Sequence, residues 1–306
     1  MIKRTLYFGN PAYLSLKNAQ MVFRRPDSDE APLTFPIEDL GIVMLDNKQI
    51  TITQALLERL LENNCAVITC DSTHMPTGLF LPLDVHTLQS ERFRAQVDST
   101  KPLRKQLWQQ TVKAKIQNQA YVLKKTVPGS EVRNMQAWAS DVRSDDATNL
   151  EGRAAAYYWS YLFPNKQNFR RERDGDFPNN LLNYGYAVLR AIVARALVGS
   201  GMIPTLGIHH HNKYNAYCLA DDIMEPYRPW VDLLVKDIER EVELNDDDDG
   251  ELTTELKRKM LSIPTIDVFI NGKKHPLMVA VEITTASLAK CYSGERRTLD
   301  YPSFTP

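Results

Sequence analysis

Cysteine is scarce in this sequence, which argues against a fold stapled by disulfides or by thiolate-bound zinc. The 306 residues include four cysteines, Cys65, Cys70, Cys218 and Cys291, and none of them forms a Cys-x-x-Cys pair. A zinc ribbon binds its metal through closely spaced cysteine pairs, and a disulfide scaffold is a small chain dense in cysteine; neither pattern occurs here. We therefore expect free thiols in a reducing compartment.

Long apolar runs and glycine-rich phosphate loops are also missing. No uninterrupted apolar stretch approaches the roughly 20 residues that span a bilayer, and the opening MIKRTLYFGN lacks the apolar segment of a signal peptide. The Walker pattern of a nucleotide-binding loop does not occur. These absences predict a cytoplasmic protein that makes no membrane contact and has no P-loop nucleotide site.

Net charge is close to zero, but its distribution is uneven. The whole chain carries −1, whereas residues 91–173 hold sixteen Lys/Arg against eight Asp/Glu, and residues 221–260 hold six against fourteen. Phosphate binding depends on the local field and not on the total charge. The basic stretch is compatible with DNA binding, although two solvated helical faces of opposite sign would give the same counts.

Turn signals and apolar periodicity predict two parts with different secondary structure. Short strands are expected over Lys3–Phe8, Met21–Phe23, Leu33–Phe35, Gly41–Leu45 and Ala66–Cys70, with a turn at Met75–Gly78 and one helix after an N-cap at Thr53. Helices are expected over Arg92–Lys125 (divided by Pro102), Arg153–Phe163, Asn179–Val198, Ala220–Glu243 and Leu277–Tyr292. The fold class is therefore α+β, with a small β-rich N-terminal domain (1–87) followed by a mainly helical catalytic domain (88–306).

Residues 207–228 contain the densest group of candidate metal-binding side chains. Three histidines, His209, His210 and His211, lie a short loop before Asp222 and Glu225. The two acids are spaced i, i+3, so on a helix they share a face, and two close carboxylates repel unless a cation lies between them. Imidazole combined with hard carboxylate oxygens is a plausible site for Mg²⁺ or Mn²⁺.

A second candidate ligand is Glu151, at a predicted helix start. Basic residues surround it in the sequence and would be suited to docking a phosphate: Arg143, Arg153, Lys166, Arg170, Arg171 and Arg173. Each acid also has a purely structural interpretation as a helix cap, and the histidines as surface residues of a polar loop. Their joint occurrence favours a metal-dependent enzyme that acts on nucleic acid. A metal-dependent phosphoesterase of small substrates and a non-catalytic DNA-binding scaffold are the alternatives.

Three segments together resemble a known family. They are Asn149–Ala155 (NLEGRAA), Leu181–Arg190 (LLNYGYAVLR) and the block from Gly207 that ends LADDIMEPYRP at Pro229. In these the chain is similar to the CRISPR-associated integrase of spacer acquisition, the universal first adaptation protein, in its type II-like variant. The resemblance extends over nearly the whole chain.

That resemblance implies a site and a reaction. Glu151, His210 and Glu225 would hold the metal, with Asp222 as a fourth ligand or as an acceptor that orients one; His209 or His211 would replace His210 if the register differs by one. The reaction would be a transesterification, in which the 3′-OH of a short duplex prespacer attacks a phosphodiester at the CRISPR leader–repeat border. His210 could alternatively protonate the leaving oxygen.

The resemblance also implies partners. They would be double-stranded DNA, a second copy of the chain and a small second adaptation protein in a heterohexamer-like complex. In type II systems the RNA-guided effector nuclease and a ring-shaped DNA-end binder would take part as well. Dimerisation and partner contacts would fall to the N-terminal domain.

Overall fold

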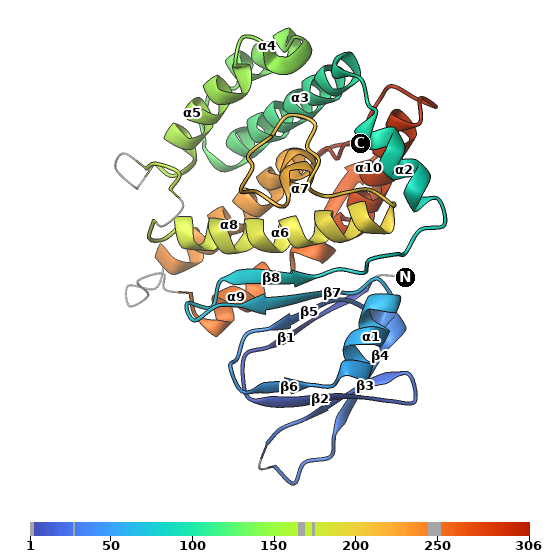
Figure 1. Ribbon diagram of the computed structural model, residues 1–306. Coiled ribbons are helices and arrows are strands. Elements are labelled where there is room, and N and C mark those ends of the chain that lie inside the picture. Colours follow the sequence, from blue (N-terminus) through green and yellow to red (C-terminus); the bar gives the residue numbers. More distant parts are fainter. Residues whose placement is uncertain (1–2, 27, 165–168, 173–174, 244–251) are drawn as a thin grey trace. The chain divides into compact units, whose positions relative to one another are not determined.

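The computed structural model describes residues 3–26, 28–164, 169–172, 175–243 and 252–306, which fall into two compact units, 1–89 and 90–306 (Figure 1). The first unit is rich in strands and the second in helices, so the predicted α+β class is confirmed. The aspartate-rich stretch 245–250 lies outside the described residues. Each unit is described below by itself.

Two four-stranded sheets build the N-terminal unit. The first has the order β1 (Arg4–Phe8), β5 (Leu40–Leu45), β7 (Ala66–Cys70), β8 (Pro76–Phe80), and the second the order β4 (Leu33–Pro36), β3 (Gln20–Arg24), β2 (Ala12–Lys17), β6 (Ile50–Ile52). Strand β5 pairs in parallel with both β1 and β7. Its sequence LGIVML is buried almost throughout, as expected for a central strand covered on both faces. Helix α1 (Gln54–Glu62) and the short turn η1 (Ile37–Asp39) complete the unit.

The sequence prediction lacked strands β2 and β6, and it placed a turn where the structure has a strand. Pro76–Phe80 forms β8, where a turn was expected over Met75–Gly78, and the chain reverses earlier, where the Asp71 amide donates to the Met75 carbonyl (3.0 Å). The Asp71 carboxylate accepts the amides of Thr73 and Met75 and so supplies the turn chemistry. Proline is tolerated there because β8 is an edge strand and Pro76 is its first residue.

Helices form most of the second unit. They are α2 (Gln89–Val97), α3 (Lys101–Thr126), α4 (Arg133–Asp141), α5 (Leu150–Leu162), α6 (Asn179–Gly199), α7 (Cys218–Met224), α8 (Arg228–Glu243), α9 (Thr254–Met260) and α10 (Leu277–Tyr292), with short turns η2 (Ser144–Asp146), η3 (Glu225–Tyr227) and η4 (Ile263–Thr265). A hairpin of β9 (Asp267–Ile270) and β10 (Lys273–Pro276) precedes α10. The sequence prediction lacked this hairpin and α9.

Long helices at the centre of this unit follow the sequence signals closely. Helix α3 begins after Thr100, whose hydroxyl accepts the Leu103 amide, and Pro102 occupies its first turn as predicted. By length and composition α6 could cross a membrane, but 78% of its most apolar window is buried inside the protein. Its apolar character is therefore accounted for by packing in the core.

Candidate functional site

Glu151 and Glu225 converge on one buried lysine. Lys115, in the middle of α3, donates a hydrogen bond from Nζ to Glu151 Oε1, and the same Nζ lies 2.5 Å from Glu225 Oε2. Arg228 Nη2 lies 3.0 Å from the other oxygen of Glu225. The side chains of Lys115 and Glu225 are 9% and 5% exposed, and that of Glu151 is 27% exposed. Two carboxylates from distant segments are therefore held together by cationic side chains in a mostly buried place.

A strained loop before α5 places Glu151. Asp145, Asp146 and Asn149 all have positive φ, between 47° and 67°, a region in which aspartate and asparagine are the tolerated non-glycine residues. The carboxylate of Asp146 accepts the amides of Leu150 and Glu151, each at 2.9 Å. Asn149 is the N-cap of α5, and Asp146 accepts two further amides of the first turn, which fixes the backbone from which the Glu151 side chain extends.

Glu225 lies in the tight turn η3 between α7 and α8. The carbonyl of the next residue, Pro226, accepts a hydrogen bond from Asn118 Nδ2 of α3 at 2.9 Å, and the same amide group donates to the Pro302 carbonyl of the C-terminal segment at 3.0 Å. Glu225 Oε2 is buried, and its close partner is the Lys115 ammonium group, whose Nζ lies 2.5 Å away. A cationic group therefore already lies against this oxygen.

The histidine loop is held by Asp222. The side chain of Asp222 is fully buried and accepts the backbone amides of Ile208 (2.6 Å), His209 (2.9 Å) and His210 (3.3 Å). It also lies 2.5 Å from Nδ1 of His210. Gly207 is required here, since a Cβ at that position would lie 2.3 Å from the His210 carbonyl oxygen. Asp222 therefore orients His210 and leaves Nε2 as the ring nitrogen available to a ligand.

The three histidines have three different environments. His209 stacks on Trp108 with ring centroids 4.3 Å apart and lies 3.8 Å from Asp145. His210 is the one that pairs with Asp222, and its side chain is 45% exposed. His211 lines a neighbouring cavity. This arrangement favours His210 as the ligand over its two neighbours.

Asp222 and Glu225 do not share a site in the way that the i, i+3 spacing suggested. Asp222 faces the histidine loop, while Glu225 faces α3 and α8. Their mutual repulsion is relieved by separate partners and not by a common ion. The pairing with Asp222 is the main reason that the pKa of His210 is raised, with Glu225 and Glu151 adding to it.

The buried charges perturb one another strongly. Burial alone would lower the pKa of Lys115, but Glu225 and Glu151 outweigh it and the pKa is raised. Burial would raise the pKa of Glu225, but Arg228 and Lys115 outweigh it and the pKa is lowered. Each group is therefore charged, and the cluster is electrostatically interdependent.

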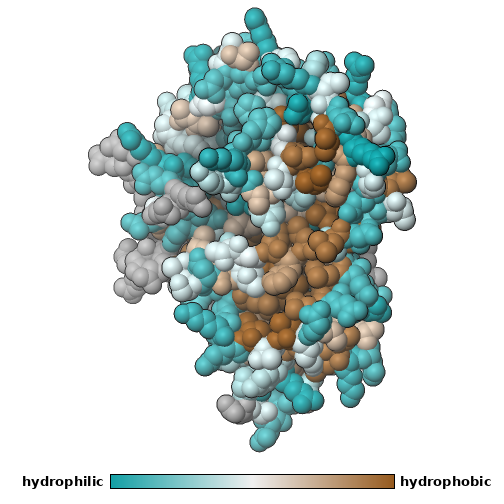
Figure 2. Space-filling view, viewed as in Figure 1, coloured by the Kyte–Doolittle hydropathy of each residue, from teal (hydrophilic) through white to brown (hydrophobic). Residues whose placement is uncertain are grey.

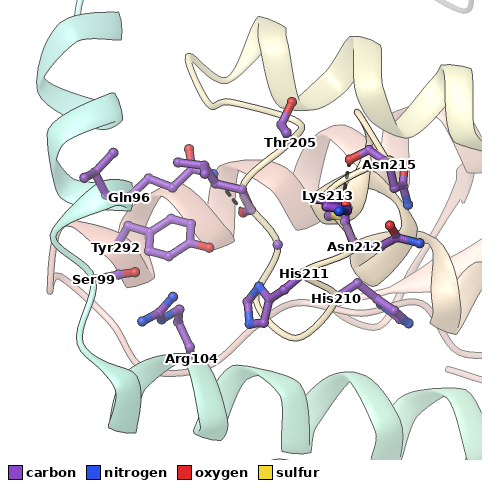
Figure 3. A pocket seen from close by; sticks show the side chains of 14 residues that line it. Gln96, Ser99, Arg104, Thr205, His210, His211, Asn212, Lys213, Asn215 and Tyr292 are labelled. Atoms are coloured by element: carbon purple, nitrogen blue, oxygen red, sulfur yellow. Dashed lines mark hydrogen bonds between the residues drawn. The ribbon is translucent and has the colours of Figure 1, made fainter.

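An open cavity of about 420 Å³ borders His210. Arg104 of α3, His211 and Lys213 of the loop, and Tyr292 of α10 are among its lining residues. Figure 3 shows Arg104 and His211 facing the same open space, with Tyr292 beside them. Cationic and hydrogen-bonding groups around an open space can hold a phosphate-bearing ligand.

The basic residues expected to bind DNA differ in how exposed their side chains are and in whether these already contact other residues. Arg143 and Arg170 are exposed, and the guanidinium of Arg153 lies 4.7 Å from the ring centroid of Trp138. Arg171 donates to the side-chain oxygens of Asn179 (2.9 Å) and Asn183 (2.6 Å) at the start of α6. Lys166 and Arg173 lie outside the described residues.

Sequence reasoning missed three residues of this site, Lys115, Arg228 and Asp146. A signal existed for Lys115, which falls on the same helical stripe as the buried residues Trp108 and Val112. A lysine on an apolar stripe needs a buried anionic partner. The sequence does not say which acids provide it.

The donor set suits a hard divalent cation. Two carboxylates and an imidazole are present, and Glu225 Oε2 is a buried oxygen that already faces a cationic group, the Lys115 ammonium. Among the described residues, no three His, Cys, Asp or Glu side chains already surround an ion-sized space. With the lysine between the carboxylates, binding a metal would require side chains to rearrange.

Comparisons with known proteins agree on one family. The family model described as "CRISPR associated protein Cas1" matches residues 6–264. The "CRISPR-associated endonuclease Cas1" of Neisseria meningitidis serogroup C (strain 8013) is 35% identical over 307 residues, covering 100% of this chain and 98% of the relative.

Solved structures share the fold. "Casposase bound to integration product" superposes with a TM-score of 0.80 at 21% identity, covering 98% of this chain and 93% of that one. A chain of the "Cas6-RT-Cas1--Cas2 complex" superposes with a TM-score of 0.74 at 21% identity, covering 97% of this chain and 36% of that longer chain.

Proposed function

Because this chain belongs to the CRISPR-associated Cas1 family, we propose that it is a metal-dependent DNA endonuclease and integrase. It would join the 3′-OH of a short duplex prespacer to a phosphodiester at the edge of a CRISPR repeat. One phosphodiester replaces another in such a transesterification, so no energy-coupling nucleotide is required. The convergence of Glu151 and Glu225 on one positively charged group, the Lys115 ammonium, carries this proposal.

We assign the binding of Mg²⁺ or Mn²⁺ to three residues. Glu151 and Glu225 would supply carboxylate oxygens and His210 its Nε2, while Asp222 positions the imidazole through Nδ1. A divalent cation bound there supplies Lewis-acid polarisation of the scissile phosphate and stabilisation of the leaving oxygen. The buried Glu225 Oε2, which already lies against the positive charge of Lys115, supports this assignment.

The other residues bind and orient the DNA. Arg228, beside Glu225, keeps positive charge next to the reacting phosphate, and Arg104 and Lys213 at the cavity would grip phosphates on either side of it. Exposed Arg143 and Arg170 would contact the backbone further away. His210, with its raised pKa, could alternatively protonate the leaving 3′-oxygen if it does not bind the cation.

The partners follow from the relatives. One superposed structure is a casposase bound to an integration product, and another is a complex that contains Cas1 and Cas2. We propose duplex DNA and a small second adaptation protein as partners of this chain, and the type II effector nuclease and DNA-end binder as further ones.

A second copy of the chain is a further proposed partner, and the N-terminal unit supports it. Figure 2 shows a hydrophobic area in the view drawn, part of which lies over the strands of this unit. Tyr13 (52% exposed) and Leu33 (56% exposed) help to line an open groove on its second sheet. Exposed apolar surface of this kind is typical of protein contacts.

A strand-transfer assay tests the function. The purified protein and its small partner are incubated with Mn²⁺, a fluorescent duplex with free 3′-OH ends, and a supercoiled plasmid that carries a leader and repeat. Wild type should transfer the label to the plasmid, and EDTA, Glu225→Gln or His210→Ala should abolish the transfer. Glu255→Gln, which changes an exposed glutamate of α9, should leave it intact. Full transfer by Glu225→Gln or in EDTA would refute the proposed function.

A further inference from the structure

Lys115 contributes an ion pair to this site that the proposed reaction does not explain. Its side chain lies on the buried face of α3, is 9% exposed, and reaches both Glu151 and Glu225. Taking an ammonium ion out of water costs several kcal/mol unless close anions compensate. Both anions that compensate it here are proposed metal ligands.

The ammonium group and a divalent cation would need the same space. Metal–oxygen distances for Mg²⁺ are about 2.0–2.1 Å, and Lys115 Nζ already lies 2.5 Å from Glu225 Oε2 while bonded to Glu151 Oε1. An ion that binds both carboxylates must therefore move this ammonium group. The four-carbon side chain of lysine is flexible enough to swing away without a change in the helix.

Charge balance leads to the same conclusion. Lys115 and Arg228 offset Glu151 and Glu225, so the cluster is neutral as it stands. Adding a divalent cation while both basic groups stay would leave a net charge of about +2 in a poorly solvated place, which is unfavourable. Arg228 is held on the other oxygen of Glu225 and over the ring of Tyr186, 4.7 Å from its centroid. Lys115 is the basic group that lies between the ligands.

We propose that Lys115 is the built-in counter-ion of the metal site, which holds Glu151 and Glu225 together until a divalent cation displaces it. This inference rests on the proposed function, since it takes these two glutamates as metal ligands. Lys115 is in this account a positioning residue. It keeps the metal-free site folded, and it weakens metal binding by competing for the same oxygens.

The test is a direct binding measurement on the full chain. Isothermal titration with MnCl₂ compares wild type, Lys115→Met and Lys115→Gln with Lys113→Met. Lys113 is the matched control because it lies two residues earlier on α3, roughly 200° around the helix from Lys115. Thermal melting in EDTA and in saturating Mn²⁺ provides a second readout that does not depend on activity.

Both Lys115 variants should bind Mn²⁺ roughly tenfold or more tightly than wild type, because the competing cation is gone. In EDTA these variants should melt at a lower temperature than wild type. The rise in melting temperature on adding Mn²⁺ should be larger for them than for wild type. Lys113→Met should match wild type in both measurements. Equal or weaker binding by the Lys115 variants, with wild type binding normally, would overturn the inference alone. If no protein bound Mn²⁺, the proposed metal site would fail as well.

Discussion

Replacing Asp222 with asparagine should weaken the hydrogen bonds that hold the histidine loop in place and so destabilise the folded protein. The carboxylate receives three backbone amides and the imidazole of His210, and its side chain is fully buried. Asparagine has the same shape but one acceptor oxygen, and its NH₂ group would face N–H donors. Two lost hydrogen bonds to a charged group, at about 1.5–2 kcal/mol each, predict a loss of about 3–4 kcal/mol in the free energy of unfolding.

The pH dependence of this loss has a definite sign. Because the pKa of His210 is raised in the folded protein, chiefly by Asp222, its pairing contributes fully below the unfolded pKa of about 6.5 and fades as pH rises through the folded value. The difference between wild type and Asp222→Asn should therefore be larger at pH 6 than at pH 9.

Urea unfolding followed by tryptophan fluorescence measures this effect cleanly. All four tryptophans lie in the helical unit that contains the site, so the signal reports on that unit. The buffer contains EDTA, which removes any contribution of bound metal. Asp237→Asn is the control, since its ion pair with Arg240 is about half exposed and should be worth less than about 1 kcal/mol. A loss under about 1 kcal/mol in Asp222→Asn would refute the anchoring role.

Four further outcomes are expected. Asp146→Ala should cost about 1–2 kcal/mol in urea unfolding, because the amides of Leu150 and Glu151 lose their cap; an unchanged midpoint would contradict this. Burial raises the pKa of Asp232 to about 6, so the stability that this side chain contributes should fall by roughly 3 kcal/mol as pH rises from about 4 to 6. The difference in unfolding free energy between wild type and Asp232→Asn should change with pH accordingly, and parallel profiles would argue against it. Phe304→Ala should lower the free energy of unfolding by about 2–4 kcal/mol, because the ring stacks on both Tyr121 and Trp230. A melting temperature equal to that of wild type would contradict this packing. DNA affinity should fall steeply with salt, and Arg143→Ala should reduce the salt slope by about 1 in fluorescence anisotropy; a salt-independent affinity would favour a small-molecule phosphoesterase.

The sequence predicted the helices of the second unit well because their signals are local. Pro102 in a first turn and the mainly apolar composition of Leu277–Tyr292, with no proline or glycine, each indicate a helix without reference to the rest of the chain. Strand β8 was mistaken for a turn because proline and glycine also occur in edge strands. The hairpin of β9 and β10 is too short for a clear alternating pattern.

The site was only partly accessible from the sequence. Resemblance pointed to Glu151, His210, Asp222 and Glu225, and the structure brings Glu151 to Glu225 and Asp222 to His210. Lys115 could not be assigned, because its contacts depend on how α3 packs against α5 and η3. No local pattern encodes such a contact between distant segments.

Anomalous diffraction from crystals soaked in Mn²⁺ would test the central claim most directly. The account predicts one strong peak within about 2.0–2.4 Å of carboxylate oxygens of Glu151 and Glu225 and of Nε2 of His210. Lys115 should then have left its place between the carboxylates. A peak on His209 or His211 instead, or no peak while Lys115 keeps both contacts, would contradict the account.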